Sequence, residues 1–545
     1  MTNRILTTVI ALILALGMLC SAVADGYFNE EGYPICDEPI DVTVAFVATG
    51  TNHNWETFDM YNRFLEDFGI RLHCLDFASG EDLKSQFTMW LASDSMPDMM
   101  SHAALSMNDA AKYGSEGYLL NLADYLEYMP NLCRLFEMNP DYRPSISAPD
   151  GGIYGLATVE LNVFGRVNRV YINRLWLENV GMEQPQTIDE LYDVLVAFRD
   201  NDANGNGDPD DEIPFGFNYG AWDKDMLLAA FGILTGDPNY SLQADENGEV
   251  YLANMSENYR AYLEFLHKCY DENLIDRECF VIDNTQRQEK VKSDVYGLFA
   301  APAPFAWAGK NMDYDANFNW VAGLTSDYND IKYIPLANSI SNQLSFIISA
   351  KTEYPEALCR LIDWALSEEG EVTVQRGWEG INMEYQYNDI FEGYIANMII
   401  PAEYTSQEDY KLNKVLLNQV FGPYASRSVG THYRLLLTAS DEAIFGDAAV
   451  NERGWSVLVE RGRRAEGVVE TNVFPALIYL PEEAEARATL VTDISNYVQT
   501  AAADFIIGKL DLENDWDSYI ATLNGMKLDE LLEIENAAYS RLMGN

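Results

Sequence analysis

The sequence predicts an α/β fold in which mainly parallel sheets are flanked by helices. Residues 41–49 (DVTVAFVAT) are rich in β-branched side chains, which is typical of a buried strand. Residues 58–68 then place apolar side chains at helical spacing, and 71–77, 82–91 and 98–100 continue as strand, helix and strand. Short strands that alternate with helices in this way indicate βαβ units, whose strands run parallel.

The same alternation returns later in the chain, and helices dominate after it. A helix is predicted over 187–198, because Thr187 and Glu190 form a capping box ahead of its apolar face. Further strands are predicted at 169–172, 332–335 and 345–350. The later helices are predicted at 355–367, 409–420, 482–508 and 528–542. No repeat or low-complexity linker separates these segments, which favours interwoven domains.

The N-terminal segment, residues 1–24, is predicted to be an export signal. Arg4 is its basic residue, residues 5–20 are mostly apolar, and Ala22-Val23-Ala24 supply the small residues that a signal peptidase requires. A membrane anchor is the alternative, but the apolar run is shorter than the roughly 20 residues that span a bilayer. Leu19 stands where a lipoprotein signal needs a small residue before its cysteine, so lipid anchoring is not expected.

Charge and length restrict the class of protein. With 86 acidic and 35 basic residues among 545, the formal net charge is −51. Such a charge repels nucleic acid and anionic lipid. At roughly 100–200 residues per domain, the length predicts two to four domains. The cysteines beyond the signal show no CxxC spacing, so both disulfides and free thiols remain open: Cys36, Cys74, Cys133, Cys269, Cys279 and Cys359.

The loop DANGNGDPDDE, residues 202–212, predicts a calcium site. Oxygen-bearing side chains stand at its positions 1, 3 and 5, and a glycine stands at position 6, where the loop must turn sharply. A hard cation with six to eight oxygen ligands needs this spacing, and position 7 would add its backbone carbonyl. The predicted ligands are Asp202, Asn204, Asn206, Asp208, Asp210, Asp211 and Glu212.

This loop differs from an EF-hand at its end. Ile213 stands at position 12 in place of a glutamate, and Pro214 follows, so no second helix leaves the loop. Because a calcium sensor opens by moving a pair of helices, the ion is expected to be structural. A plain polar turn is the alternative, since Asn-Gly pairs are common in turns.

Residues 170–215 resemble the characteristic segment of a known family. In that segment a strand and a Trp-Leu-x-x-x-Gly turn lead to a Pro-x-Thr-capped helix and to a calcium loop that ends in Asp-Glu-Ile-Pro. The family is extracellular solute-binding proteins family 1, in the group of the periplasmic alginate-binding proteins and the sugar-binding lipoproteins of Firmicutes. Three acidic residues stand at 210–212 where that pattern has one fewer, so the ligands among them stay open. Other similar pieces lie at 90–99, 150–156, 354–370, 377–380 and 516–542.

The resemblance implies a two-lobed periplasmic-binding-protein-like fold of type II. Each lobe would be a mainly parallel sheet flanked by helices, and hinge segments would join the lobes around a ligand. The N-terminal lobe is expected at 25–155, with a return segment at 291–350. The C-terminal lobe is expected at 156–290, including the calcium loop, and at 351–545.

The resemblance also implies the extracellular subunit of an ABC importer. Such a subunit is a monomer that captures a carbohydrate and delivers it to membrane permease subunits. No enzymatic activity is expected, and no HExxH, GxSxG or phosphate-loop motif occurs. A glycan-binding sensor or adhesin without a transporter, a peptide-binding importer subunit and a glycoside hydrolase are the alternatives.

Candidate ligand contacts are polar and aromatic side chains in predicted loops. Sugars present flat C–H faces and hydroxyls, which planar rings, acids and amides can bind. A tryptophan in a loop is better placed to face a ligand than one on the apolar face of a helix. Residues just after the first strand lie where open α/β sheets place their ligands. The candidates are Asn52, His53, Trp55, Trp222, Trp307, Trp378 and Glu379.

Overall fold

The computed structural model describes residues 27–48, 55–101, 105–219, 227–404, 410, 415, 425–426 and 431–544. The predicted export signal lies outside these residues. No helix among them is long and apolar enough to span a bilayer. The six cysteines beyond the signal all lie within the described part and carry free thiols, with no disulfide between them.

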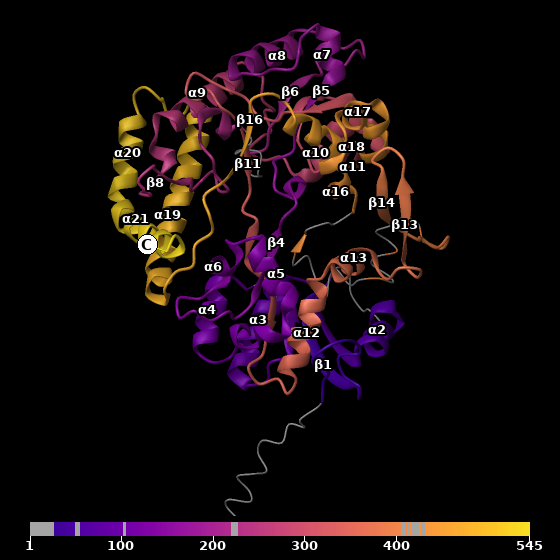
Figure 1. The fold of residues 1–545 in the computed structure, drawn as a ribbon. Helices are drawn as coiled ribbons and strands as arrows, with labels where there is room; N and C mark the ends of the chain where they lie inside the picture. The colour runs from indigo at the N-terminus through magenta and orange to yellow at the C-terminus, as the bar shows by residue number, and fades with distance from the viewer. Residues whose placement is uncertain are drawn as a thin grey trace, which may run out of the picture. The chain divides into compact units, whose positions relative to one another are not determined.

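The chain divides into two compact units, each assembled from separate stretches of sequence (Figure 1). Unit 1 comprises residues 1–158, 342–384 and 398–424, and unit 2 comprises 159–341, 385–397 and 425–545. Several crossings between the units fall within strands: β4 (Leu156–Glu160), β12 (Ile340–Ile348), β13 (Met383–Asn388) and β14 (Gly393–Met398). Strands therefore carry the chain from one unit to the other.

Unit 1 contains most of a six-stranded sheet with the order β15-β4-β12-β3-β1-β2. β1 (Ile40–Val47) pairs in parallel with β2 (Ile70–Phe77) and β3 (Met99–Ser101), whereas β12 runs antiparallel to β3. The predicted succession of strand, helix and strand is thus confirmed for this part of the chain. Its helices are α2 (Asp59–Arg63), α3 (Gly80–Ser93), α4 (Met107–Ser115), α5 (Pro130–Met138), α6 (Tyr142–Ile146), α12 (Pro355–Ala365) and α13 (Glu368–Arg376), and β15 is Ala425–Ser426.

Unit 2 is built on a four-stranded sheet with the order β10-β5-β9-β6. β6 (Ile213–Gly216) pairs in parallel with β9 (Tyr296–Ala300), and β5 (Val170–Asn173) runs antiparallel to β9 and to β10 (Phe318–Trp320). The smaller pairs are β7 (Leu242–Ala244) with β8 (Val250–Leu252) and β11 (Lys332–Leu336) with β16 (Val468–Asn472).

Unit 2 also contains many helices, several of them near the C-terminus. The C-terminal helix α19 packs against both α9 and α21 (Figure 1). The helices are α7 (Arg174–Val180), α8 (Ile188–Asp200), α9 (Glu257–Asp271), α10 (Asn284–Lys292), α11 (Pro304–Ala308), α16 (Thr431–Thr438), α17 (Asp441–Phe445), α18 (Asp447–Arg463), α19 (Pro481–Ile506), α20 (Trp516–Gly525) and α21 (Leu528–Leu542). The helix predicted at 409–420 lies almost wholly outside the described residues.

Helix α8 begins as its sequence predicts. The hydroxyl of Thr187 accepts a hydrogen bond from the backbone N–H of Glu190 at 3.1 Å. The Glu190 carboxylate accepts from the backbone N–H of Gln186 at 2.7 Å, one residue before the expected position. Leu191, Leu195 and Phe198 form the buried face of this helix. The helix is therefore fixed at its first turn and leads directly into the loop at 202–212.

Two of the expected lobe segments differ from the observed division. Residues 291–341 lie in unit 2, because β9 and β10 pair with β5 of that unit. Residues 351–384 lie in unit 1, where Asp363 of α12 accepts hydrogen bonds from Asn131 and Leu132 of α5. A strand or helix can be read from local sequence, but its partner is distant in the chain, so sequence order assigned these segments wrongly.

Candidate functional site

A rigid loop in unit 1 carries two of the predicted ligand contacts, Trp378 and Glu379. It follows α13 through Gly377, whose φ of 86° lies in the left-handed region, and a Cβ there would come within 2.3 Å of the Asn382 side chain. Asn382 is fully buried, and its side-chain oxygen accepts from the Trp378 N–H at 3.1 Å. Its amide donates to the Asp59 carboxylate at 2.8 Å and to the Tyr410 hydroxyl at 2.9 Å. The loop is therefore fixed to the start of α2.

Within this loop the two predicted contacts differ in exposure. Trp378 is only 8% exposed, and its ring centroid lies 6.3 Å from that of Phe64 and 5.9 Å from the guanidinium carbon of Arg63. Glu379 is exposed. The tryptophan thus packs mainly inside unit 1, whereas the carboxylate beside it is accessible. Both residues belong to unit 1, which corrects their expected place in the C-terminal lobe.

Trp55 belongs to the same corner of unit 1. It lies in a short 3-10 turn after β1, is partly exposed, and contacts Phe46 and Phe58 with ring centroids 5.2 Å apart in each pair. Phe58 directly precedes Asp59, which binds Asn382. The structure therefore brings Trp55 and the loop of Glu379 together near the carboxyl end of β1. Asn52 and His53 lie outside the described residues.

In unit 2, Trp307 packs as a core residue. It lies on the short helix α11, where the sequence predicted a loop, and is 9% exposed. The guanidinium carbon of Arg287, a fully buried residue, lies 4.7 Å from the centroid of its ring. Aromatic rings attract cations on their faces, so this contact stabilises both buried side chains. Trp222 lies outside the described residues.

Sequence reasoning assigned no role to Trp455, which the structure places at a break in α18. Gly454 departs from helical geometry with φ 45° and ψ −128°, and the N–H of Trp455 donates to the buried carboxylate of Asp315 at 2.7 Å. Asp315 also accepts from the N–H of Phe305 at 2.8 Å. The ring of the partly exposed Trp455 lies 3.9 Å from the guanidinium carbon of Arg169. In the sequence, the pair Gly454-Trp455 is the signal that could have indicated this break in the helix.

Burial raises the pKa of Asp315 to about 6, although the two backbone N–H donors lower it. One carboxylate thus serves as a cap for α11 and for the second half of α18. This arrangement holds Trp455 in a defined orientation.

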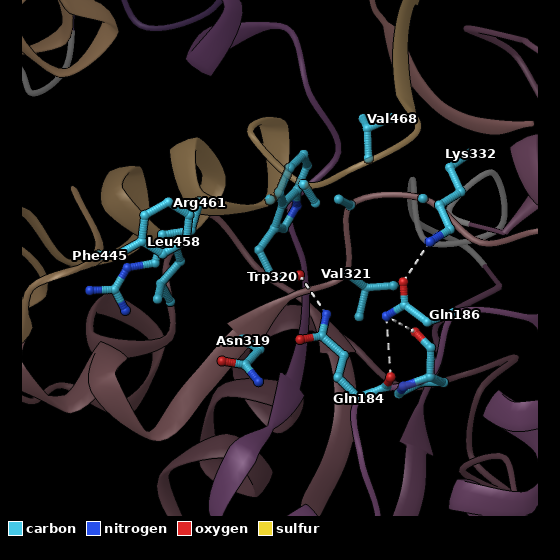
Figure 2. Close-up of a pocket in the computed structure, with 15 residues that line it drawn as sticks. Gln184, Gln186, Asn319, Trp320, Val321, Lys332, Phe445, Leu458, Arg461 and Val468 are labelled. Carbon is cyan, nitrogen blue, oxygen red and sulfur yellow. Dashed lines mark hydrogen bonds between the residues drawn. The ribbon is translucent and has the colours of Figure 1, made fainter. Parts of the chain in front are cut away.

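Unit 2 also contains an amide-lined pocket of about 270 Å³ beside the edge strand β10 (Figure 2). The side-chain amide of Gln184 donates to the carbonyl of Trp320 at 3.1 Å, and the Lys332 ammonium donates to the Gln186 side chain at 2.6 Å. Asn319 also lines it (Figure 2). None of the predicted ligand contacts is among its described lining residues.

The loop at 202–212 forms a chain of side-chain-to-backbone turns. Oδ2 of Asp202 accepts from the N–H of Gly207 at 2.9 Å. Oδ1 of Asn204 accepts from the N–H of Asn206 at 2.9 Å, and Oδ1 of Asn206 accepts from the N–H of Asp208 at 2.7 Å. These bonds hold successive side chains toward the inside of the turn.

Two buried carboxylate oxygens in this loop have no hydrogen-bond partner: Oδ1 of Asp202 and Oε2 of Glu212. Burial raises the pKa of Glu212, and the neighbouring Asp211 contributes to the rise. Asp211 accepts from the side-chain amides of Asn204 and Asn206, and Asp210 is exposed. Unpaired buried carboxylate oxygens suit a hard cation. Across the described residues, however, no group of three or more histidines, cysteines or acids is arranged as a metal site.

Comparison with known proteins identifies relatives of the chain. No protein-family model matches the chain. The fructooligosaccharide ABC transporter substrate-binding protein FusA of Streptococcus pneumoniae serotype 4 is 26% identical over 502 residues, which are 89% of this chain and 87% of FusA. The structure of FusA in complex with kestose has a TM-score of 0.70 at 22% identity, and covers 93% of this chain and 100% of that one. Over most of its length the chain is similar to substrate-binding proteins of ABC transporters.

The expected α/β fold is confirmed for this chain, with mixed sheets that have parallel cores. Two further structures share it. An EF-hand mutant of FusA in complex with fructo-nystose has a TM-score of 0.69 at 21% identity, with 93% of this chain and 100% of that one covered. The alginate-binding protein AlgQ2 without calcium ion has a TM-score of 0.63 at 18% identity, and the match covers 92% of this chain and 98% of that one. Relatives of this fold thus include proteins described by an EF-hand and by calcium.

The similarity to these proteins also bears on catalysis. Solute-binding proteins are not enzymes, so the expectation of a non-enzymatic chain is confirmed, and a glycoside hydrolase is excluded.

Proposed function

We propose that this solute-binding protein captures an oligosaccharide and delivers it to the membrane subunits of an ABC importer. The observation that carries the proposal is the similarity to FusA, a fructooligosaccharide-binding protein, which extends over 89% of the chain and is not confined to one motif. Similarity of this extent includes both units and the segments between them. The protein is proposed to act outside the membrane as a monomer after export.

The ligand-binding part of unit 1 is proposed to be Trp55 together with the loop of Trp378 and Glu379. An exposed carboxylate can accept hydrogen bonds from two neighbouring hydroxyls, and a partly exposed ring can cover the C–H face of a sugar. Because Asn382 fixes the loop, little conformational freedom is lost when the ligand binds, which favours affinity. Trp378, being mostly buried, supports Glu379 and presents at most a ring edge. Asn52, His53 and Trp222 remain proposed contacts, whereas Trp307 is packed in the core of unit 2 and is not favoured as one.

The loop at 202–212 is proposed to hold a structural calcium ion. Asp202 and Glu212 would supply their unpaired carboxylate oxygens, and the loop would contribute the carbonyl of Asp208. Glu212 is favoured over Asp210, which is exposed, and over Asp211, whose oxygens already accept from two amides. The ion would neutralise carboxylates that otherwise repel one another. The remaining proposed ligands are Asn204 and Asn206.

The test of the proposed function is calorimetric titration of the mature protein with kestose, with fructo-nystose and with an unrelated tetrapeptide. A sugar should bind with saturable heat, and Glu379→Ala should weaken that binding at least tenfold, because a charge-assisted contact contributes about 1.5–3 kcal/mol. Glu403→Ala, another exposed acid of unit 1, should bind as the parent does. Binding of the peptide and of no sugar would favour the peptide-binding alternative.

A further inference from the structure

A second groove, of about 390 Å³, lies in unit 2 at the N-terminal end of α8, and none of the proposed ligand or cation residues lines it. Its floor is apolar and includes the buried rings of Phe231 and Phe265. Its rim is polar and includes the exposed carboxylates of Asp189, Glu264 and Asp327. Tyr328 stands at the rim and is 49% exposed. The groove thus combines an apolar floor, a polar rim and an exposed aromatic ring.

The turn that carries Asp327 and Tyr328 is rigid. Ser326 and Asn329 exchange backbone hydrogen bonds across it at 2.8 and 3.2 Å. The Ser326 hydroxyl donates to the carbonyl of Ala230 at 2.7 Å, and the Asn329 side chain donates to that of Ala229 at 3.2 Å. Both side chains at the tip are thus held on a scaffold that is already formed.

The same turn is also attached to the start of α8. The N–H of Thr325 donates to the carbonyl of Gln186 at 3.1 Å, and the N–H of Ile188 donates to the carbonyl of Thr325 at 2.9 Å. These bonds place the turn beside Asp189 on the first turn of the helix. The ring of Tyr328 lies 6.4 Å from that of Phe231, at an interplanar angle of 41°. A tilted, half-exposed ring therefore borders the apolar floor.

The charges at the rim of the groove indicate which class of ligand it can bind. Three carboxylates and one cation, Lys268, line it among the described residues. The Lys268 ammonium lies 3.3 Å from the centroid of the Tyr192 ring, so the ring faces part of its charge. Glu264 is paired with Arg260 at 3.3 Å, so the carboxylates of Asp189 and Asp327 dominate the remaining field, which is negative and repels anions. Carboxylates accept hydrogen bonds from hydroxyls, and an apolar floor with an aromatic edge accommodates the C–H face of a ring.

We propose that this groove is a second carbohydrate-binding site, which takes a short segment of a neutral polysaccharide. It goes beyond the proposed function, because it holds a chain at the surface of unit 2 and does not depend on the residues around Glu379. A site of this kind would keep the protein on a polymer from which the transported oligosaccharides derive. Tyr328 supplies the ring contact, and Asp327 and Asp189 accept from hydroxyls.

The experiment is affinity electrophoresis of the mature chain in native gels that contain inulin or a neutral β-glucan. All variants carry Trp55→Ala and Glu379→Ala, so that the proposed ligand site of unit 1 does not contribute. The parent double variant should be retarded by at least one of the two polymers relative to a gel without polymer. Tyr328→Ala should abolish the retardation, and Tyr328→Phe, which keeps the ring, should retain it. Tyr251→Ala, which removes another exposed tyrosine of unit 2, is the control and should remain retarded.

Three outcomes would overturn this proposal. The first is that neither polymer retards the parent double variant. The second is that Tyr328→Ala is retarded as strongly as the parent. The third is that polygalacturonate retards the parent as strongly as the neutral polymers do. If Tyr328→Ala lowers the melting temperature, the exposed pair Asp189→Asn with Asp327→Asn replaces it with the same expected loss. Titration of the unmodified protein with kestose tests the proposed function separately, so failure of either idea is distinguishable from failure of the other.

Discussion

The side-chain amide of Asn382 donates a hydrogen bond to the carboxylate of Asp59 over 2.8 Å, although 323 positions separate the two residues. The same amide donates to Tyr410, and the Asn382 oxygen receives the backbone N–H of Trp378. A single buried side chain thus joins the loop of Glu379 to the segment that begins at Trp55. The geometry of the proposed ligand site in unit 1 depends on this residue.

Replacing Asn382 by leucine should disturb both stability and ligand affinity. The change leaves Asp59 and the N–H of Trp378 without their partner, and an unsatisfied buried polar group costs about 1–3 kcal/mol. Urea denaturation should show a loss of that size, and titration with kestose should show weaker binding because the loop is no longer fixed. Asn397→Leu, which removes a hydrogen bond between exposed side chains, is the control. Unchanged stability would mean that the network contributes little.

Trp378 and Glu379 should respond differently to alanine, although they are neighbours. Trp378→Ala should lower the free energy of unfolding by about 3–5 kcal/mol, because a large ring that is 8% exposed leaves a cavity when it is removed. Glu379→Ala should leave the melting temperature nearly unchanged and weaken sugar binding. Thermal denaturation and calorimetry on the two variants measure both effects. The opposite pattern, with a stable Trp378→Ala that binds no sugar, would make the ring a direct contact.

Removal of calcium should lower stability and leave sugar affinity nearly unchanged. A cation that binds only the folded form stabilises it by mass action, and without it the carboxylates of 202–212 repel one another. Excess chelator should therefore lower the melting temperature, and added calcium should restore it. Asp202→Ala should have the lower melting temperature with or without chelator, whereas the exposed Asp330→Ala should behave as the parent does. Loss of sugar binding with unchanged stability would instead place the ion at the ligand site.

The stability of unit 2 should depend on pH through Asp315. Burial raises the pKa of this carboxyl from its ordinary value of 3.8 to about 6. Because the folded state binds the proton more tightly than the unfolded state, this group's contribution to stability falls as the pH rises from about 4 to about 6, by at most about 3 kcal/mol. The loss is half-way through the titration of the folded state at about pH 6 and is nearly complete about one pH unit higher.

Urea denaturation followed by tryptophan fluorescence between pH 4 and 7 checks this expectation. Asp315→Asn cannot titrate, so the difference in stability between the parent and this variant should change with pH across the same interval. The variant itself should be less stable at pH 4, because an amide oxygen replaces only one of the two acceptors that Phe305 and Trp455 use. A constant difference at all pH values would show that Asp315 ionises at its ordinary pKa.

Local sequence patterns predicted the elements of this fold better than their assembly. β1, α3 and α21 follow from runs of apolar residues within one segment, and the start of α8 follows from its capping residues. The assignment of 291–341 and 351–384 failed, because β-strand partners and helix contacts lie far away in the chain. The two-unit organisation came from family resemblance and not from periodicity.

In the candidate site, too, local sequence predicted some features, whereas others depend on contacts between distant residues. The loop at 202–212 was found from its spacing, since all its oxygen-bearing side chains lie within eleven consecutive residues. The burial of Trp378 depends on Phe64 and Arg63, which no local pattern connects with it. The break in α18 at Gly454 depends on Asp315, and a glycine inside a helical pattern does not by itself indicate such a cap.

The discontinuous make-up of the two units has a consequence for how the polypeptide is synthesised. Residues 1–158 leave the ribosome without β12, α12 and α13, so unit 1 cannot close its sheet or its helical layer until residue 384 has been made. Unit 2 needs the C-terminal helices as well. Neither unit is therefore encoded by one uninterrupted stretch, and neither can complete its native contacts until late in translation. This delay suits the export that residues 1–24 predict, because translocation through the secretory channel requires an unfolded chain.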